Sequence, residues 1–220
     1  KYGIENEDVD FLAQNIIFDE NGLPEFDCYK YNEFFAHFKL SIPGKHNVLN
    51  ALSCIALCDA YGISIECMKS AFEKFTGADR RFQFKSILNG AKIYDDYGHH
   101  PTEVAATATA LNNKKFNKSW VVFQPHTYSR TFNHLDDFAN ALLAFDNIIV
   151  TDIYAAREVN TYNISSEDLV NAIIKLGKDA KYIPSLEDCA SYLKQNVQND
   201  DIVLTLGAGT VTNIGPMIIN

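Results

Sequence analysis

KIYDDYGHHPTEVAATATALNNKKFNKSWVVFQ, residues 92–124, contains two apolar strands separated by one helix. Alternating apolar residues predict a strand over Lys92–Tyr97, and the apolar run Trp120–Gln124 predicts a second strand. Between them, Thr102–Leu111 has helical apolar spacing, and Pro101 is a residue that commonly opens a helix. Two strands joined by a helix of this length are expected to lie parallel in one sheet.

The same alternation continues toward the C-terminus. Three more helices are expected, each followed by a strand. The helix at residues 135–145 precedes a strand at 148–153, the helix at 165–176 precedes a strand at 181–183, and the helix at 185–197 precedes a strand at 202–206. Ser165 and Asp168 form a capping-box-like pair at one of these helix starts. The pattern predicts an α/β fold: a mostly parallel sheet with helices on both faces, in which ligands gather at the carboxyl ends of the strands.

The pattern differs on the N-terminal side. Asn89-Gly90 predicts a hairpin turn that pairs the segment around Phe84 with the strand at residues 92–97. Residues 1–43 alternate short apolar runs with turn signals and predict strands, whereas residues 44–77 predict a helical hairpin with Ser64 as a cap. We therefore expect two domains, residues 1–78 and residues 79–220.

Composition narrows the class of protein. The net charge of −9 argues against nucleic acid as a partner, and no apolar run approaches the ~20 residues that cross a membrane. The polar start is unlike a signal peptide. The five cysteines include no CxxC pair, and Cys54 and Cys58 are expected to be buried thiols among apolar neighbours rather than metal ligands. These features predict a reduced, cytoplasmic protein without a membrane partner.

The richest polar cluster is DDYGHHPTE, Asp95–Glu103, between a predicted strand and a predicted helix. Its carboxylates, phenol and imidazoles exceed what a turn requires, although a solvated turn is the alternative. A helix opening at Pro101 would present its amide groups to an anion. Adjacent histidines, here His99 and His100, point in different directions, so at most one would bind a metal ion, and no metal site is expected.

A second cluster, FQPHTYSRT (Phe123–Thr131), follows the next predicted strand. The planar guanidinium of Arg130 suits a carboxylate or a phosphate, and His126 and Tyr128 add neutral donors. A surface loop that leads into a helix is the alternative interpretation, with about equal weight.

Three weaker signals accompany these clusters. Asn47 and Asn50 lie three apart at a helix start, where their amides can bind a base edge or cap the helix. The pair Arg80-Arg81 lies at the predicted domain junction and suits phosphate or ribose recognition, with plain solvated charge as the alternative. Gly207 and Gly209 would allow close backbone approach to a ligand.

No GxxxxGK[ST] loop occurs in this sequence, so an ATP phosphate cradle would lie on another segment. The first residue, Lys1, does not resemble a natural start. We therefore expect the C-terminal part of a longer protein, inactive by itself.

In their order along the chain, these motifs resemble the Mur ligase family. The series runs PGKHNVLNA, RRF, DDYGHHPTE, FQPHTYSRT, DIYAA and GAG, and it covers nearly the whole chain. The resemblance implies an enzyme with an N-terminal UDP-sugar domain, a central P-loop ATPase domain and a C-terminal Rossmann-like domain. Residues 1–78 would end the central domain, and residues 79–220 would form the C-terminal one.

The resemblance also implies a reaction. Family members use ATP and Mg²⁺ to make an acyl phosphate, which an amine then attacks, in peptidoglycan precursor synthesis. The middle motifs are most similar to the member that joins L-alanine to UDP-N-acetylmuramate. Carried over by motif, the resemblance implies four groups of residues. The adenine would lie against His46, Asn47 and Asn50, and the phosphates or ribose of ATP would contact Arg81 and Asp96. The catalytic and substrate-binding residues would be Tyr97, His99, His126 and Arg130, and the amino acid would lie near Gly207 and Gly209.

Two positions depart from the family pattern. Thr127 stands where many members carry Arg, so that a carboxylate or phosphate contact is lost or moved to Arg130, and Arg157 stands where a small residue is common. The P-loop lysine, the magnesium ligands and the UDP site have no counterpart in the sequence.

Three alternatives remain at this point. A murein-recycling ligase attaches a tripeptide to the same sugar nucleotide, although the Phe123–Thr131 motif favours the alanine-adding member. A non-catalytic nucleotide-binding module would explain the missing P-loop. A metal-dependent hydrolase is the most distant alternative, and it would use Asp95, Asp96, His99 and His100.

Overall fold

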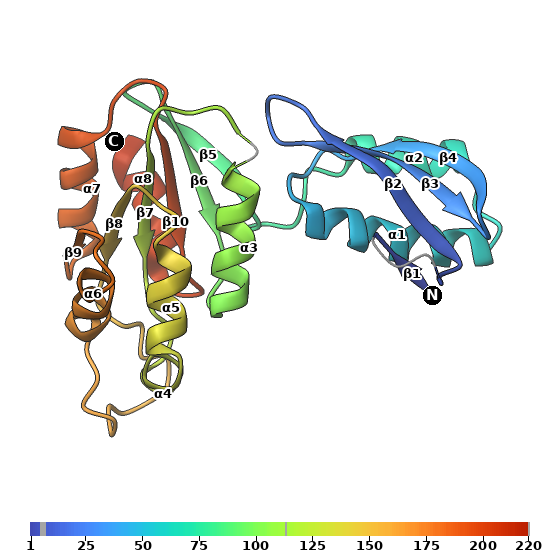
Figure 1. The fold of residues 1–220 in the computed structure, drawn as a ribbon. Helices are drawn as coiled ribbons and strands as arrows, with labels where there is room; N and C mark the ends of the chain where they lie inside the picture. Colours follow the sequence, from blue (N-terminus) through green and yellow to red (C-terminus); the bar gives the residue numbers. More distant parts are fainter. Residues whose placement is uncertain (5–7, 113, 220) are drawn as a thin grey trace. The chain divides into compact units, whose positions relative to one another are not determined.

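The computed structural model describes residues 1–4, 8–112 and 114–219, and the chain separates into two compact units. The first unit comprises residues 1–77 with residues 109–115, and the second comprises residues 78–108 with the remainder of the chain. Each unit has its own sheet and its own helices (Figure 1).

The first unit is a four-stranded sheet in the order β1-β2-β3-β4 with two helices. Its elements are β1 (Tyr2–Gly3), β2 (Phe11–Phe18), β3 (Pro24–Lys30), β4 (Glu33–Lys39), α1 (Lys45–Ala60) and α2 (Ile65–Lys74). β2, β3 and β4 are antiparallel, and Tyr31 and Asn32 adopt positive φ angles of 49° and 65° in the tight turn between β3 and β4. Ser64 caps α2 by accepting a hydrogen bond from the Cys67 amide, which confirms the predicted cap.

The core of the first unit lies between its sheet and its helices. Phe26 and Phe38 stack with ring centroids 5.9 Å apart, and Leu52 and Ile55 of α1 are fully buried. The prediction that Cys54 and Cys58 are both buried is wrong, since Cys54 is exposed and Cys58 is only half-buried. The cause is the phase of the helix, whose buried stripe passes through Leu52 and Ile55 and leaves Cys54 outside it.

The second unit contains a six-stranded sheet in the order β5-β6-β10-β7-β8-β9. Its strands are β5 (Gln83–Leu88), β6 (Ala91–Asp96), β7 (Ser119–Phe123), β8 (Asn147–Val150), β9 (Ala180–Tyr182) and β10 (Ile202–Leu206). All neighbouring pairs are parallel except β5–β6, which the turn at Asn89 and Gly90 joins as an antiparallel hairpin. The predicted mostly parallel sheet and its hairpin are therefore confirmed.

Helices cover both faces of this sheet (Figure 1). They are α3 (Pro101–Asn112), α4 (Tyr128–Asn133), α5 (Leu135–Leu142), α6 (Ser166–Lys175), α7 (Leu186–Asn196), the 3-10 helix η1 (Thr210–Asn213) and α8 (Ile214–Ile219). On one face, Phe138 of α5 packs against Phe123 with ring centroids 5.2 Å apart. On the other, Leu193 of α7 and Ile214 of α8 share a buried cluster with Trp120.

Two predicted boundaries in the second unit are wrong. The strand expected to run to residue 153 ends at Val150, because its neighbour β9 is short and its last residue, Tyr182, pairs with Val150. The helix expected over residues 135–145 ends at Leu142, and a separate short helix, α4, precedes it. The capping box of Ser165 and Asp168 is confirmed.

The register of the parallel strands determines where the polar motifs lie. Asp96 pairs with Leu206, Leu206 pairs with Phe123, and Phe123 pairs with Val150. These four strands therefore end level with one another, and the residues that follow them leave the same edge of the sheet.

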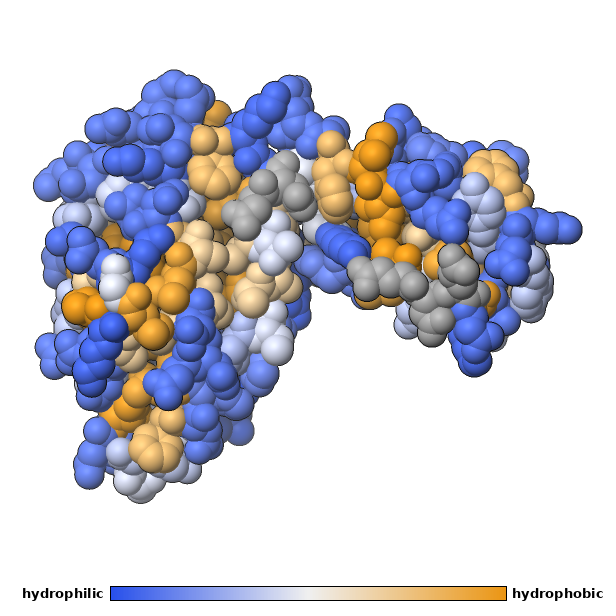
Figure 2. All heavy atoms as spheres, in the orientation of Figure 1, coloured by the Kyte–Doolittle hydropathy of each residue, from blue (hydrophilic) through white to orange (hydrophobic). Residues whose placement is uncertain are grey.

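On the face shown in Figure 2, hydrophilic residues cover much of each unit, with apolar residues between them. Among the described residues, no helix combines the length and the apolar character that a membrane span needs.

Candidate active site

The end of β6 turns around the carboxylate of Asp96. This side chain is 5% exposed, and its oxygens accept hydrogen bonds from the amides of Phe82 (2.8 Å) and Gly98 (2.7 Å). Burial raises the pKa of Asp96, while these two amides and the Arg81 charge lower it. Both oxygens are thus used by the chain itself, so the position of Asp96 is explained by the turn that it holds.

The start of α3 is covered by one of its own carboxylates. An oxygen of Glu103, in the first turn, accepts hydrogen bonds from the amides of His99 (2.9 Å) and His100 (3.1 Å). Pro101 opens the helix as expected, but the first-turn amides of Glu103 and Val104, which were expected to face an anion, already donate to the carbonyl of His100 (2.9 and 3.0 Å).

The two neighbouring imidazoles face different side chains. The ring of His99 lies 5.6 Å from that of His126, whereas the ring of His100 lies 5.0 Å from that of His134. Within residues 1–4, 8–112 and 114–219, no group of three or more His, Cys, Asp or Glu side chains is placed to hold a metal ion.

His126 and Arg130 form a coupled pair at the start of α4. Nη1 of Arg130 donates to the carbonyl of His126 (2.9 Å) and lies 3.1 Å from His126 Nδ1. Because a guanidinium can only donate, Nδ1 is the acceptor and the proton of the neutral ring is on Nε2. Burial, Arg130 and His99 all lower the pKa of His126, which favours this neutral, donating ring.

His99 has the opposite arrangement. Its Nδ1 lies 3.0 Å from the carbonyl of Tyr97, which can only accept, so Nδ1 carries a proton and Nε2 of the neutral ring is an acceptor. Its ring also makes an edge contact with Tyr97, at 5.4 Å between centroids. Two adjacent imidazoles thus supply one acceptor and one donor.

Glu158 was not predicted as a site residue, yet it anchors the loop that carries His126. Its carboxylate accepts hydrogen bonds from the Thr127 hydroxyl (2.7 Å), the Ser129 amide (2.8 Å) and the Ser129 hydroxyl. These bonds lower the pKa of Glu158 to about 2. Thr127 is therefore a hydrogen-bond partner of Glu158, and neighbouring Arg157 is exposed.

The glycine loop after β10 packs tightly against the protein. A Cβ atom at Gly209 would lie 2.4 Å from Oε1 of Gln124 and 2.6 Å from the ring of Tyr154, and one at Gly207 would lie 2.6 Å from the Gln124 carbonyl. These glycines are therefore required by contacts within the chain, whether or not a ligand approaches. Tyr154 in turn stacks on His126, with ring centroids 5.6 Å apart.

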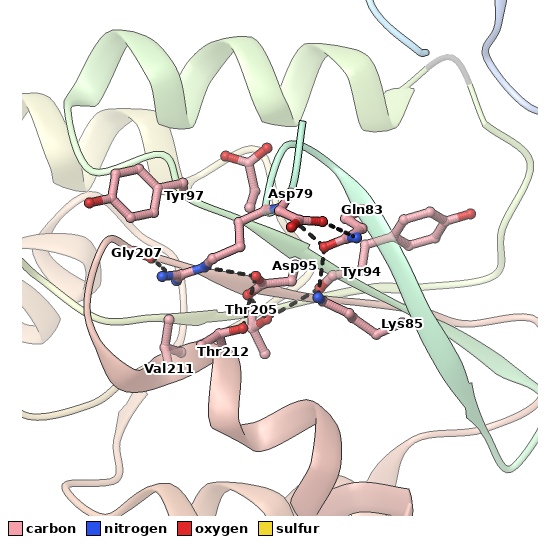
Figure 3. Close-up of polar contacts among 12 residues, drawn as sticks. Asp79, Gln83, Lys85, Tyr94, Asp95, Tyr97, Thr205, Gly207, Val211 and Thr212 are labelled. Atoms are coloured by element: carbon pink, nitrogen blue, oxygen red, sulfur yellow. Dashed lines mark hydrogen bonds and ion pairs between the residues drawn. The ribbon is translucent and has the colours of Figure 1, made fainter. Parts of the chain in front are cut away.

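Two arginines flank the ring of Tyr97, which is 38% exposed. The guanidinium carbon of Arg81 lies 6.0 Å from the ring centroid, and its Nη1 lies 3.4 Å from Glu103. Arg80, which was not assigned to the site, pairs with the buried carboxylate of Asp95 at 3.0 Å. Figure 3 shows Asp95 beside Thr205 and Thr212, which also contact its carboxylate. Charge pairs of this kind cannot be found from spacing, because their members lie on different elements.

The remaining predicted residues belong to the first unit. Asn50 donates to the side-chain oxygen of Asn47 (3.0 Å), so both amides face one side of α1 as predicted. Asn47 also donates to the carbonyl of Pro43, a capping contact, and exposed His46 precedes it. Asn47 and Asn50 line a pocket of about 350 Å³ whose other walls are residues such as Phe72.

The second unit thus brings together four predicted site residues: Tyr97 and His99 after β6, His126 after β7, and Arg130 in α4. It also places Gly207 beside Asp96, whose carbonyl accepts a hydrogen bond from the Gly207 amide (3.0 Å). The first unit holds the two asparagines and His46 as a separate group.

Comparison with known proteins adds independent findings. Residues 80–209 match the family described as Mur ligase, glutamate ligase domain. The UDP-N-acetylmuramate--L-alanine ligase of Caldanaerobacter subterraneus is 47% identical over 214 residues, which cover 97% of this chain and 46% of that protein. The chain thus spans about half the length of this curated relative.

Solved structures show the same fold. The UDP-N-acetylmuramate-alanine ligase of Thermotoga maritima is similar with a TM-score of 0.83 and 25% identity, over 99% of this chain and 46% of that one. The murein peptide ligase of Psychrobacter arcticus is similar with a TM-score of 0.67 and 21% identity, over 100% of this chain and 45% of that one.

Proposed function

Because the chain belongs to the Mur ligase family, we propose that the protein containing it joins L-alanine to the carboxylate of UDP-N-acetylmuramate at the expense of ATP, in peptidoglycan precursor synthesis. The observation that carries the proposal is the adjacent pair His99 and His126 with Arg130, at the carboxyl ends of parallel strands. The free thiols of the described chain suit a reducing, cytoplasmic setting.

The chemistry needs an acceptor and donors in one place. In the reaction, a carboxylate oxygen attacks the terminal phosphorus of ATP and ADP leaves; the amine nitrogen then attacks the acyl carbon, and phosphate leaves as the amide forms. The attacking nitrogen must lose a proton, and the proposal gives this proton to Nε2 of His99, since the contact of Nδ1 with the Tyr97 carbonyl leaves Nε2 as the acceptor of the neutral ring. Negative charge on the adduct is stabilised by Nε2–H of His126 and by the guanidinium of Arg130.

The residues around this group would position the substrates. Tyr97 offers a half-exposed phenol beside His99, and the loop at Gly207 and Gly209 borders the same strand ends. Arg81, which is more than half exposed, would meet the phosphates of ATP, whereas Asp96 would act through the turn that it holds.

In the first unit, we assign the adenine to the side of α1 that carries Asn47 and Asn50, with His46 beside them. The apolar pocket that the two amides border supports this assignment, because a purine ring needs flat apolar walls and a few amide partners. Magnesium is assigned no ligand in this chain, since the described residues offer no suitable cluster.

The test is ATP-dependent phosphate release by the complete protein with Mg²⁺, UDP-N-acetylmuramate and either L-alanine or the murein tripeptide. Release that depends on alanine is expected. Release only with the tripeptide would make the protein a recycling ligase, and release with neither would support a non-catalytic nucleotide-binding module. The 220-residue chain alone is expected to release none.

A further inference from the structure

The side chain of Arg80 joins three parts of the second unit. Nε donates to Asp95 (3.0 Å), Nη2 donates to the carbonyl of Gly207 (2.6 Å), and the guanidinium carbon lies 4.9 Å from the ring centroid of Tyr97. The backbone adds a fourth contact, because the Arg80 carbonyl accepts a hydrogen bond from the Tyr97 amide (2.6 Å). One residue therefore contacts the ends of both β6 and β10.

The carboxylate of Asp95 holds this guanidinium in place. Asp95 is fully buried, and it also accepts hydrogen bonds from the hydroxyls of Thr205 (2.6 Å) and Thr212 (3.0 Å) (Figure 3). Removing the arginine would leave a buried, unpaired charge, which is strongly unfavourable. The arginine is only 21% exposed, so the pair is also shielded from solvent.

The contacts of Arg80 match what a positioning group requires. Two of its five N–H donors are used by Asp95 and Gly207, and its guanidinium lies over the ring of Tyr97, so its described contacts are all with groups of the chain. Both supported residues, Tyr97 and Gly207, are substrate-side residues in the proposed function. Arg81 follows directly, and its guanidinium carbon lies 6.0 Å from the centroid of the same ring.

We infer that Arg80 is a positioning residue of the ligase site, which fixes Tyr97 and the Gly207 loop relative to each other. The inference rests on the proposed function for its catalytic consequence. A lysine at this position would retain the charge next to Asp95, but it lacks the planar fork that binds the Gly207 carbonyl at the same time and supports the ring.

The test compares Arg80→Lys with Arg157→Lys, the same change at an exposed arginine, in the complete ligase. Displacement of positioned groups by about 1 Å can cost on the order of 100-fold in rate. We expect Arg80→Lys to lower kcat/KM for L-alanine by about 10- to 100-fold, mainly through KM. Arg157→Lys should remain at the wild-type value.

A second readout in the 220-residue chain does not depend on activity. NMR signals of the Tyr97 ring and of the Gly207 carbonyl carbon should shift in Arg80→Lys and stay in place in Arg157→Lys. Should Arg80→Lys fail to fold, Thr212→Val is the second variant. It removes the hydrogen bond from half-buried Thr212 to Asp95, and it should lower kcat/KM for L-alanine in the same way but by less.

The outcomes separate the two claims. If the wild type shows alanine-dependent activity and Arg80→Lys has unchanged kinetics, the positioning role in catalysis is overturned and the proposed function stands. A shift of the NMR signals would not change that result. Absence of activity in the wild-type complete protein would overturn the proposed function and the catalytic consequence with it. Shifted signals would then still show that Arg80 holds Tyr97 and Gly207.

Discussion

At the scale of single residues, position 209 requires a glycine because of its tight packing and not because of its backbone conformation. Its φ is −92°, which any residue can adopt, but an added Cβ would lie 2.4 Å from Gln124 and 2.6 Å from the ring of Tyr154. Gly215, in α8, is the contrasting position, since its Cβ would meet nothing closer than 3.9 Å.

We therefore expect Gly209→Ala to destabilise the second unit by about 1–3 kcal/mol, as overpacking does. Gly215→Ala should be neutral or stabilising by up to about 1 kcal/mol, because alanine is favoured over glycine in a helix. Urea unfolding of both variants measures the difference. Equal stability of the two variants would show that the loop relaxes around the added methyl group.

The tautomer and charge of His126 are a second residue-scale consequence. Burial, Arg130 and His99 lower its pKa below the ordinary 6.5, so the ring is neutral at pH 6.5 and above. A lowered histidine pKa means that protonation opposes folding, so its effect on stability is absent at pH 8 and grows as the pH falls below 6.5.

NMR titration of the chain should show His126 as the Nε2–H tautomer, with a pKa below 6.5 that rises in Arg130→Met, because the nearby positive charge is removed. An unchanged pKa in the variant would mean that Arg130 does not act on the ring.

At the scale of elements, Glu158 links the loop after β8 to the start of α4. Its pKa of about 2 lies below the ordinary 4.5, so its hydrogen bonds stabilise the folded state fully above about pH 4.5 and progressively less as the pH falls toward 2.

Glu158→Gln should lower the urea midpoint at pH 7, and the gap to the wild type should narrow between pH 4.5 and the acid limit of the measurement. Glu20→Gln, at an exposed turn, should show no such gap. A gap for Glu158→Gln that is constant with pH would contradict the role of its charge.

Elements with their own local signals could be predicted from sequence. The strand Ile202–Leu206 has the predicted bounds, and Ser165 and Asp168 form the predicted capping box. Boundaries set by neighbours could not be predicted: β8 stops at Val150 because of the length of β9. A helix after the second motif was one of two interpretations of the sequence, because α4 is too short to show helical periodicity.

At the scale of the whole molecule, the strand order explains both the success and the limit of prediction for the site. Alternation of strands and helices predicts that the motifs after β6 and β7 meet at one edge, and the pair His99 and His126 confirms it. The strand between them, β10, comes last in the sequence. Contacts that depend on this order, such as Arg80 with Gly207, have no signal in residue spacing.

The central claim is that this shared edge of the sheet is where the amine meets the activated carboxylate. Its most direct test is kcat/KM for L-alanine, from phosphate release by the complete protein, in Arg130→Met and in Arg157→Met as the exposed control. We predict a loss on the order of 10²- to 10³-fold for Arg130→Met, as for removal of a charge-stabilising donor, and no change for the control. Equal activity of the two variants would contradict the claim and move the reaction away from this edge.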